Sequence, residues 1–151
     1  MNSIKGINLR HPVYVELDMR TSVMEKKDIM RWSMQCMKKV SEMWMKDLEE
    51  DELVKLSFQT MEDYLRDQIS VNDGRTVALK LHERARMETD KSVIFYYRAL
   101  GQMISIIHVK THAMGHLYYT LKMLLALNLD ITDIYLLETR TLLDDIQEVS
   151  S

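Results

Sequence analysis

The sequence predicts an all-α fold, a single compact bundle of five or six helices, and two observations carry this prediction. Turn-forming residues are scarce, with only four glycines and one proline in 151 residues. Apolar residues recur along most of the chain at spacings near the 3.6-residue period of an α-helix. The composition, 46% apolar and 28% charged, is that of an ordinary folded domain and not of a disordered chain.

The first twenty residues show a different pattern from the rest of the chain. Val13, Val15, Leu17 and Met19 alternate with polar residues, and this period of two is typical of a strand. We therefore expect residues 1–20 to form an extended N-terminal arm, which lies across the bundle or pairs with another chain. Residues 21–151 form the helical domain. Charged residues interrupt the arm, so we do not expect it to be a signal peptide.

Three helices are expected in the first half of the domain, the first from about Ser22 or Glu25 to Leu48 and the others over about residues 51–68 and 71–87. Ser70, with Asp73 three residues later, matches the pattern that caps the start of a helix. The first helix carries an apolar stripe at spacings of three and four residues: Ile29, Trp32, Cys36, Val40 and Met43.

Residues 93–127 are apolar nearly all round, which predicts a central, buried element. A continuous helix over residues 91–127 would be about 55 Å long. A domain of this size is only about 40 Å across. The sequence therefore predicts a break between His108 and Gly115, and a last helix over about residues 132–149.

Four histidines are the first candidates for chemistry. His108, His112 and His116 repeat every four residues, and His82 lies on the preceding helix. On an unbroken helix the three would share one face, within reach of a common metal ion. The alternative is that they are partly buried and hydrogen-bonded to backbone carbonyls, tyrosine hydroxyls and one another. We expect the second arrangement, and hence no metal, no other cofactor and no catalytic residue.

An acidic segment, residues 47–52, places five carboxylates in six positions. Such charge stabilises the N-terminus of a following helix. The segment could equally steer a basic partner toward the chain, which raises the association rate more than the affinity. The candidate partner-binding residues are accordingly Asp47, Glu49, Glu50, Asp51 and Glu52.

Thirteen methionines are a second sign of a partner surface. Methionine suits adaptable contact surfaces as well as irregular cores. Six of them lie on or beside the first helix and point in several directions, so we expect some at an interface. A homodimer face explains them as well as a foreign protein does. The six are Met24, Met30, Met34, Met37, Met43 and Met45.

Charge and cysteine content restrict the partners and the compartment. The formal net charge of −3 argues against a nucleic-acid partner, which requires a basic surface. Cys36 is the only cysteine and cannot form an internal disulfide, as expected in a reducing compartment. A membrane span needs about 20 mostly apolar residues, and the sequence has no such run, so we expect no membrane partner. We expect a cytoplasmic protein.

Several short runs occur in an order that resembles a known family. The most specific are an A-x-G-Q run at residues 99–102 and an H-V-x-x-H-A-x-G run at residues 108–115. With the earlier runs they resemble the helical putative immunity proteins of the immunity-five-like family, over about residues 27–127. This family carries histidine at the positions of His82, His108 and His112, whereas His116 stands where a small residue is usual. The earlier runs are Trp32-Ser33-Met34-Gln35-Cys36 with Val40 and Trp44, then Ile69-Ser70-Val71, then Ala78 with His82 and Ala85-Arg86.

The resemblance implies an all-α protein of bacterial polymorphic toxin systems, which binds and neutralises a cognate toxin by contact and catalyses no reaction. Two alternatives stay open. A metal-dependent helical-bundle enzyme similar to the DinB-like proteins would use His82 with His108 and His112, or with His112 and His116. A homodimeric structural protein would need no ligand.

Overall fold

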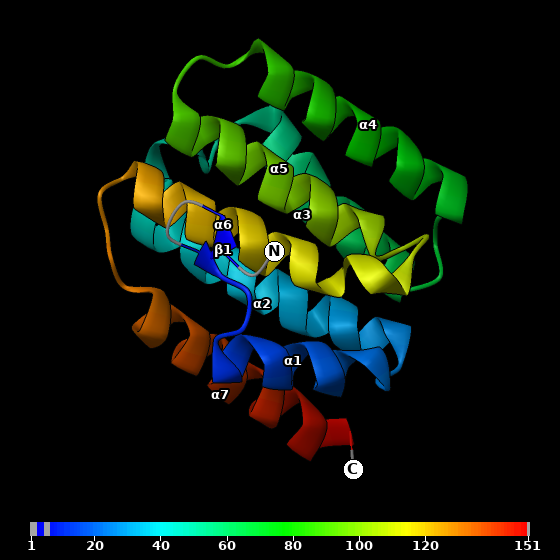
Figure 1. Ribbon diagram of the computed structural model, residues 1–151. Helices are drawn as coiled ribbons and strands as arrows, with labels where there is room; N and C mark the ends of the chain where they lie inside the picture. Colours follow the sequence, from blue (N-terminus) through cyan, green and yellow to red (C-terminus); the bar gives the residue numbers. More distant parts are fainter. Residues whose placement is uncertain (1–2, 5–6, 151) are drawn as a thin grey trace.

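The computed structural model describes residues 3–4 and 7–150, with side chains from Asn8 onward except that of Thr111. Within this part of the chain the fold is all-helical, as predicted, with seven α-helices in place of the expected five or six (Figure 1). The elements in chain order are β1 (Ser3–Ile4), β2 (Ile7–Asn8), α1 (Pro12–Ser22), α2 (Lys26–Trp44), η1 (Lys46–Leu48), α3 (Glu52–Leu65), α4 (Val71–Met87), α5 (Lys91–Ser105), η2 (Lys110–Met114), α6 (Gly115–Ala126) and α7 (Thr132–Ser150), where η denotes a 3₁₀ helix.

The seventh helix is α1, where an extended arm was expected. Pro12 occupies the first turn, and the His11 side chain accepts a hydrogen bond from the Val13 amide. Val13 and Leu17 are four residues apart and are both buried, whereas Val15 and Met19 are exposed. The alternation thus contains a helical spacing as well, and packing selects it. The extended part is limited to β1 and β2, two-residue strands that pair with each other; residues 1–2 and 5–6 of the expected arm lie outside the described residues.

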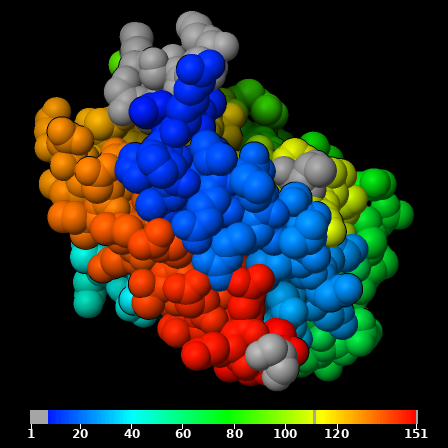
Figure 2. All heavy atoms as spheres, turned by 60° about the horizontal axis from the view of Figure 1, so that its bottom comes forward, coloured from blue at the N-terminus to red at the C-terminus, as the bar shows by residue number. Residues whose placement is uncertain are grey.

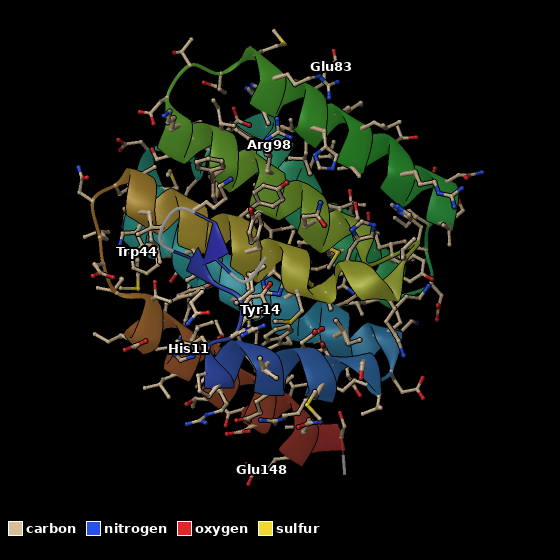
Figure 3. All side chains as sticks on the ribbon, viewed as in Figure 1. His11, Tyr14, Trp44, Glu83, Arg98 and Glu148 are labelled. Carbon is tan, nitrogen blue, oxygen red and sulfur yellow. The ribbon has the colours of Figure 1, made fainter. Side chains whose placement is uncertain are left out.

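Helices α1 and α7 lie side by side on one face of the molecule (Figure 2). His11, at the start of α1, approaches Asp133 of α7 to 2.7 Å between Nε2 and Oδ1 (Figure 3). Further along, Arg20 contacts Asp144 at 2.7 Å and Arg140 contacts Glu16 at 3.2 Å. These polar contacts attach the N-terminal helix α1 to the C-terminal helix α7.

Helix α2 is central, with contacts to α3, α5, α6 and α7. Its Trp32 is fully buried and donates a 2.8 Å hydrogen bond to the Thr139 carbonyl of α7. Cys36 is buried as well, and burial raises the pKa of its thiol, so it serves as a small apolar core residue. Of the six methionines in which a partner surface was expected, five are buried, because α2 is covered on most sides, and Met43 is exposed.

Helices α3 and α4 begin at side-chain caps that the sequence indicates. Asp51 caps α3 by accepting from the Leu53 and Val54 amides. Ser70 and Asp73 form the predicted capping box at the start of α4. Between the two helices Asp67 has a φ of 59°, a left-handed conformation that ends α3 at Leu65 and turns the chain.

The long apolar segment is broken as predicted, but the break begins before His108, directly after Ser105, and ends at Gly115. Helix α5 ends at Ser105, Val109 is extended with φ −143° and ψ 105°, and η2 leads into α6 at Gly115. The break lets α6 return alongside α5 (Figure 1). Helix α5 contacts α2, α3, α4, α6 and η2, which confirms its central place. No helix in the described part of the chain combines the length and apolarity needed to cross a membrane.

Candidate functional site

A cavity of about 320 Å³ lies between α4 and α5, at the end where α5 leads into η2. We call it the histidine cavity, because His82, His108 and His112 all line it. The structure thus brings together three of the four candidate histidines. The remaining lining residues are Arg75, Ala78, Leu79, Gln102 and Ser105.

The ring of His82 is held against the backbone of α5 at Gly101. A Cβ atom at this position would lie 2.7 Å from Cε1 of His82 and 3.1 Å from its Nε2. Glycine inside a helix costs about 1 kcal/mol relative to alanine. The close approach of the imidazole gives a reason for glycine here.

The ring of His112 is oriented by Gln102. Nδ1 of His112 lies 2.7 Å from Oε1 of Gln102, and since an amide oxygen only accepts, the ring nitrogen is the donor. Gly115 makes this arrangement possible, because a Cβ there would lie 2.7 Å from both Cγ and Cδ of Gln102. The A-x-G-Q run at residues 99–102 and the H-V-x-x-H-A-x-G run at residues 108–115 therefore meet at the histidine cavity. Their glycines leave room for the side chains of His82 and Gln102.

The two remaining imidazoles of the cavity are shifted toward their neutral forms. The pKa of His82 is lowered by partial burial, and then by the positive charges of Arg98 and Arg86. The pKa of His108 is lowered by desolvation and by Arg75. Nδ1 of His108 is buried and has no hydrogen-bond partner among the described residues. The ring centroids of His108 and His112 are 5.9 Å apart.

His116 lies outside this group, so the arrangement of three histidines on one face is wrong. The chain turn at residues 106–114 keeps His108 and His112 together and separates His116 from both. His116 is fully buried, with its ring edge-on to Trp32 at 4.8 Å between centroids. Burial lowers its pKa to about 3, so the ring is neutral at pH 7. Among the described residues, no three histidine, cysteine or carboxylate side chains are close enough together to hold a metal ion.

Two of the tyrosines that were expected to hydrogen-bond the histidines, Tyr96 and Tyr97, have other contacts. The Tyr96 hydroxyl pairs with the Ser41 hydroxyl at 2.6 Å. The Tyr97 ring lies beneath the Arg84 guanidinium, 5.1 Å from its centroid. The partner that orients a histidine of the cavity is instead Gln102.

The acidic segment divides into one structural residue, three exposed residues and one half-buried residue. Asp51 caps α3 and also pairs with Arg84 of α4, 2.8 Å between Oδ2 and Nη2, with a side chain only 17% exposed. Its charge is therefore neutralised within the fold. Asp47, Glu50 and Glu52 are exposed, and Glu49 is half-buried.

Glu49 borders an open groove of about 460 Å³ between α2 and α3. Glu42 and Glu62 also line this groove, around the half-buried ring of Phe58. Lys38 lies 3.6 Å from Glu62, and Lys55 lies 3.2 Å from Glu50. We call this surface, the groove together with Asp47, Glu50 and Glu52, the acidic groove.

Arg75 and Leu79 of the histidine cavity were not singled out in the sequence. Arg75 precedes His82 by seven residues, which is two helical turns and places both on one face of α4. That spacing could have identified Arg75. The contribution of Leu79 depends on how α4 is rotated against α5, which local spacing does not give.

The family relationship follows from comparison with known proteins. The model of a family described as Imm-5 like putative immunity protein matches residues 19–146, which is most of the chain and includes every residue of the histidine cavity and the acidic groove. Neither the curated proteins nor the solved structures contain a match. The chain belongs to the Imm-5 like putative immunity protein family.

Proposed function

We propose that this chain is a non-catalytic immunity protein, which binds a cognate bacterial toxin in the cytoplasm and neutralises it by contact. The family match over residues 19–146 is the observation that carries this proposal. The sequence and surface agree with it. A helical bundle offers a rigid binding face, and its acidic surface favours a basic protein partner over nucleic acid.

The acidic groove is our candidate contact surface. It combines exposed carboxylates with an apolar floor at Phe58, the composition of an interface with a polar rim. Carboxylates of this kind accelerate the encounter with a basic protein, in a manner that salt screens. A stable complex would bury about 1,600 Å² in total, so contacts must extend beyond the groove onto neighbouring helices.

The experiment uses the toxin encoded beside the gene for this chain. Growth is measured in cells that express the toxin with and without this chain, and the complex is measured by calorimetry. We expect restored growth and a saturable complex of defined stoichiometry. Restored growth without a detectable complex would contradict neutralisation by contact.

The contact surface is tested with matched charge reversals. In one variant Glu49, Glu50 and Glu52 become lysines; in the control Asp130, Glu138 and Asp145, exposed on α7 and the loop before it, become lysines. Both variants change the net charge equally. We expect the first to slow association about tenfold or more at low salt and to flatten its salt dependence. Equal slowing in both would remove the acidic groove from the proposal.

A further inference from the structure

The histidine cavity lies in a cluster of positive charge that the fold leaves uncompensated. Arg75 lines the cavity, and Arg86 and Arg98 lie close enough to His82 to lower its pKa (Figure 3 shows Arg98 on α5). None of the three forms an ion pair with a described residue. Arg84, on α4 like Arg75 and Arg86, shows the contrast, because it is paired with Asp51 and Glu88.

The lining of the cavity supplies hydrogen-bond donors and no carboxylate. Arg75 presents a guanidinium, which can hold two oxygen atoms at once. Gln102 accepts from His112 through its oxygen, so its amide NH₂ remains available as a donor. His82 contributes an imidazole from α4, and His108 contributes one from the turn after α5. These groups come from α4, α5 and the turn after α5, and they converge on one volume.

One wall of the cavity is apolar and open to solvent. Leu79 of α4, which is 68% exposed, lines it together with Ala78, which is buried. A ligand that carries both an oxyanion and an apolar part would cover Leu79 while it meets Arg75. The volume of about 320 Å³ suits a small molecule and not a protein helix.

We propose that the histidine cavity binds a small organic phosphate monoester, with the phosphate at Arg75 and the imidazoles and the organic part against Leu79. This site is independent of the proposed toxin contact, which lies at the acidic groove. A phosphate monoester offers three terminal oxygens to the polar groups that line the cavity from α4, α5 and the turn after α5, whereas a carboxylate offers two. A divalent cation is disfavoured, because Lys26, Arg75, Arg86 and Arg98 surround His82 and His108 with positive charge.

The test is calorimetric titration of the full chain with phenyl phosphate at pH 6.5. We expect saturable binding of one molecule, about tenfold weaker binding of inorganic phosphate because it lacks the organic part, and no binding of phenol. The Arg75→Gln variant should bind phenyl phosphate at least tenfold more weakly. The matched control is Lys80→Gln, which removes the same charge from an exposed position of α4 outside the cavity and should change affinity less than twofold.

A second arm distinguishes the kind of oxyanion and locates the site. Benzoate has the same ring with a carboxylate, and we expect it to bind at least tenfold more weakly than phenyl phosphate. The imidazole resonances of His82 and His108 should shift on saturation, whereas that of His116 should not, because it lies in the core. Absence of saturation, benzoate binding as tight as that of phenyl phosphate, or equal losses in the two variants would each overturn the proposal.

Discussion

The imidazole of His82 lies where a side chain at Gly101 would be, with its Cε1 atom 2.7 Å from the position of a Cβ. Helices α4 and α5 thereby contact each other through the ring of His82 and the backbone of Gly101, which has no side chain. A second contact of this kind involves the next residue of α5, Gln102, whose side chain lies against the backbone of Gly115 at the start of α6. These two contacts set the positions of three of the polar side chains that line the histidine cavity.

The contact between His82 and Gly101 predicts a coupling between the two positions. Gly101→Ala gains about 1 kcal/mol of helix propensity but forces the imidazole to move. In a His82→Ala background the same change has no ring to displace. We therefore expect Gly101→Ala to be less favourable by about 1 kcal/mol or more in the wild type than in that background, measured by urea unfolding. Equal effects in both backgrounds would mean that the ring does not occupy this space.

Gly115→Ala should release the ring of His112. The added methyl group displaces Gln102, which breaks the 2.7 Å hydrogen bond to Nδ1 of His112. We expect a loss of stability of about 1–2 kcal/mol. In NMR spectra, the signal of the hydrogen-bonded Nδ1 proton of His112 should disappear. Gln102→Ala is the matched variant and should remove the same proton, whereas its persistence in either variant would contradict the assigned bond.

Asp51 and its acidic neighbours should differ sharply in their effect on stability. Asp51→Ala removes both the cap of α3 and the pairing with Arg84, and we expect it to cost about 1–3 kcal/mol. Glu50→Gln and Glu52→Gln alter exposed carboxylates, and we expect them to stay within about 0.5 kcal/mol of the wild type. Thermal unfolding measures all three. A stability loss at Glu52 as large as that at Asp51 would show that the whole segment is structural.

Acid should destabilise the fold through His116. Its pKa is about 3 in the folded chain, below the ordinary value of 6.5. Between these values the unfolded chain binds a proton that the folded chain does not, so stability is greatest above pH 6.5 and falls as the pH drops. From pH 7 to pH 5 this single group accounts for about 2 kcal/mol.

The His116→Phe variant isolates this contribution. It should lose less stability than the wild type between pH 7 and pH 5, whatever its packing costs at pH 7, because the comparison is between two slopes. His82 and His108, whose pKa values are also lowered, act in the same direction and remain in both proteins. Parallel slopes in the wild type and the variant would contradict the burial of a neutral His116.

The helices from α2 to α7 could be predicted because each has a local signal. Ser70 and Asp73 mark the start of α4, and the length argument requires a break before Gly115. Helix α1 could not be separated from a strand by pattern alone, since Val13 and Leu17 satisfy both periods. Only the contacts of α1 with α7 and η2 decide between them.

The histidine cavity could not be predicted from local sequence patterns, because it too depends on contacts between separate elements. The spacing of His108, His112 and His116 describes a continuous helix, and the turn that replaces it moves His116 into the core beside Trp32. His82 and Arg75 join the group only through the packing of α4 on α5. The runs at residues 99–102 and 108–115 could be recognised in the sequence, but their contact in the folded chain could not be predicted from it.

We propose that this chain neutralises its toxin by contact and not by catalysis. The most direct measurement titrates the chain into a fixed amount of its cognate toxin and records the remaining toxin activity. We predict a linear loss of activity that ends at a fixed stoichiometric ratio and does not progress with longer incubation. Complete protection by a small fraction of one equivalent, increasing with time, would show turnover and contradict the account.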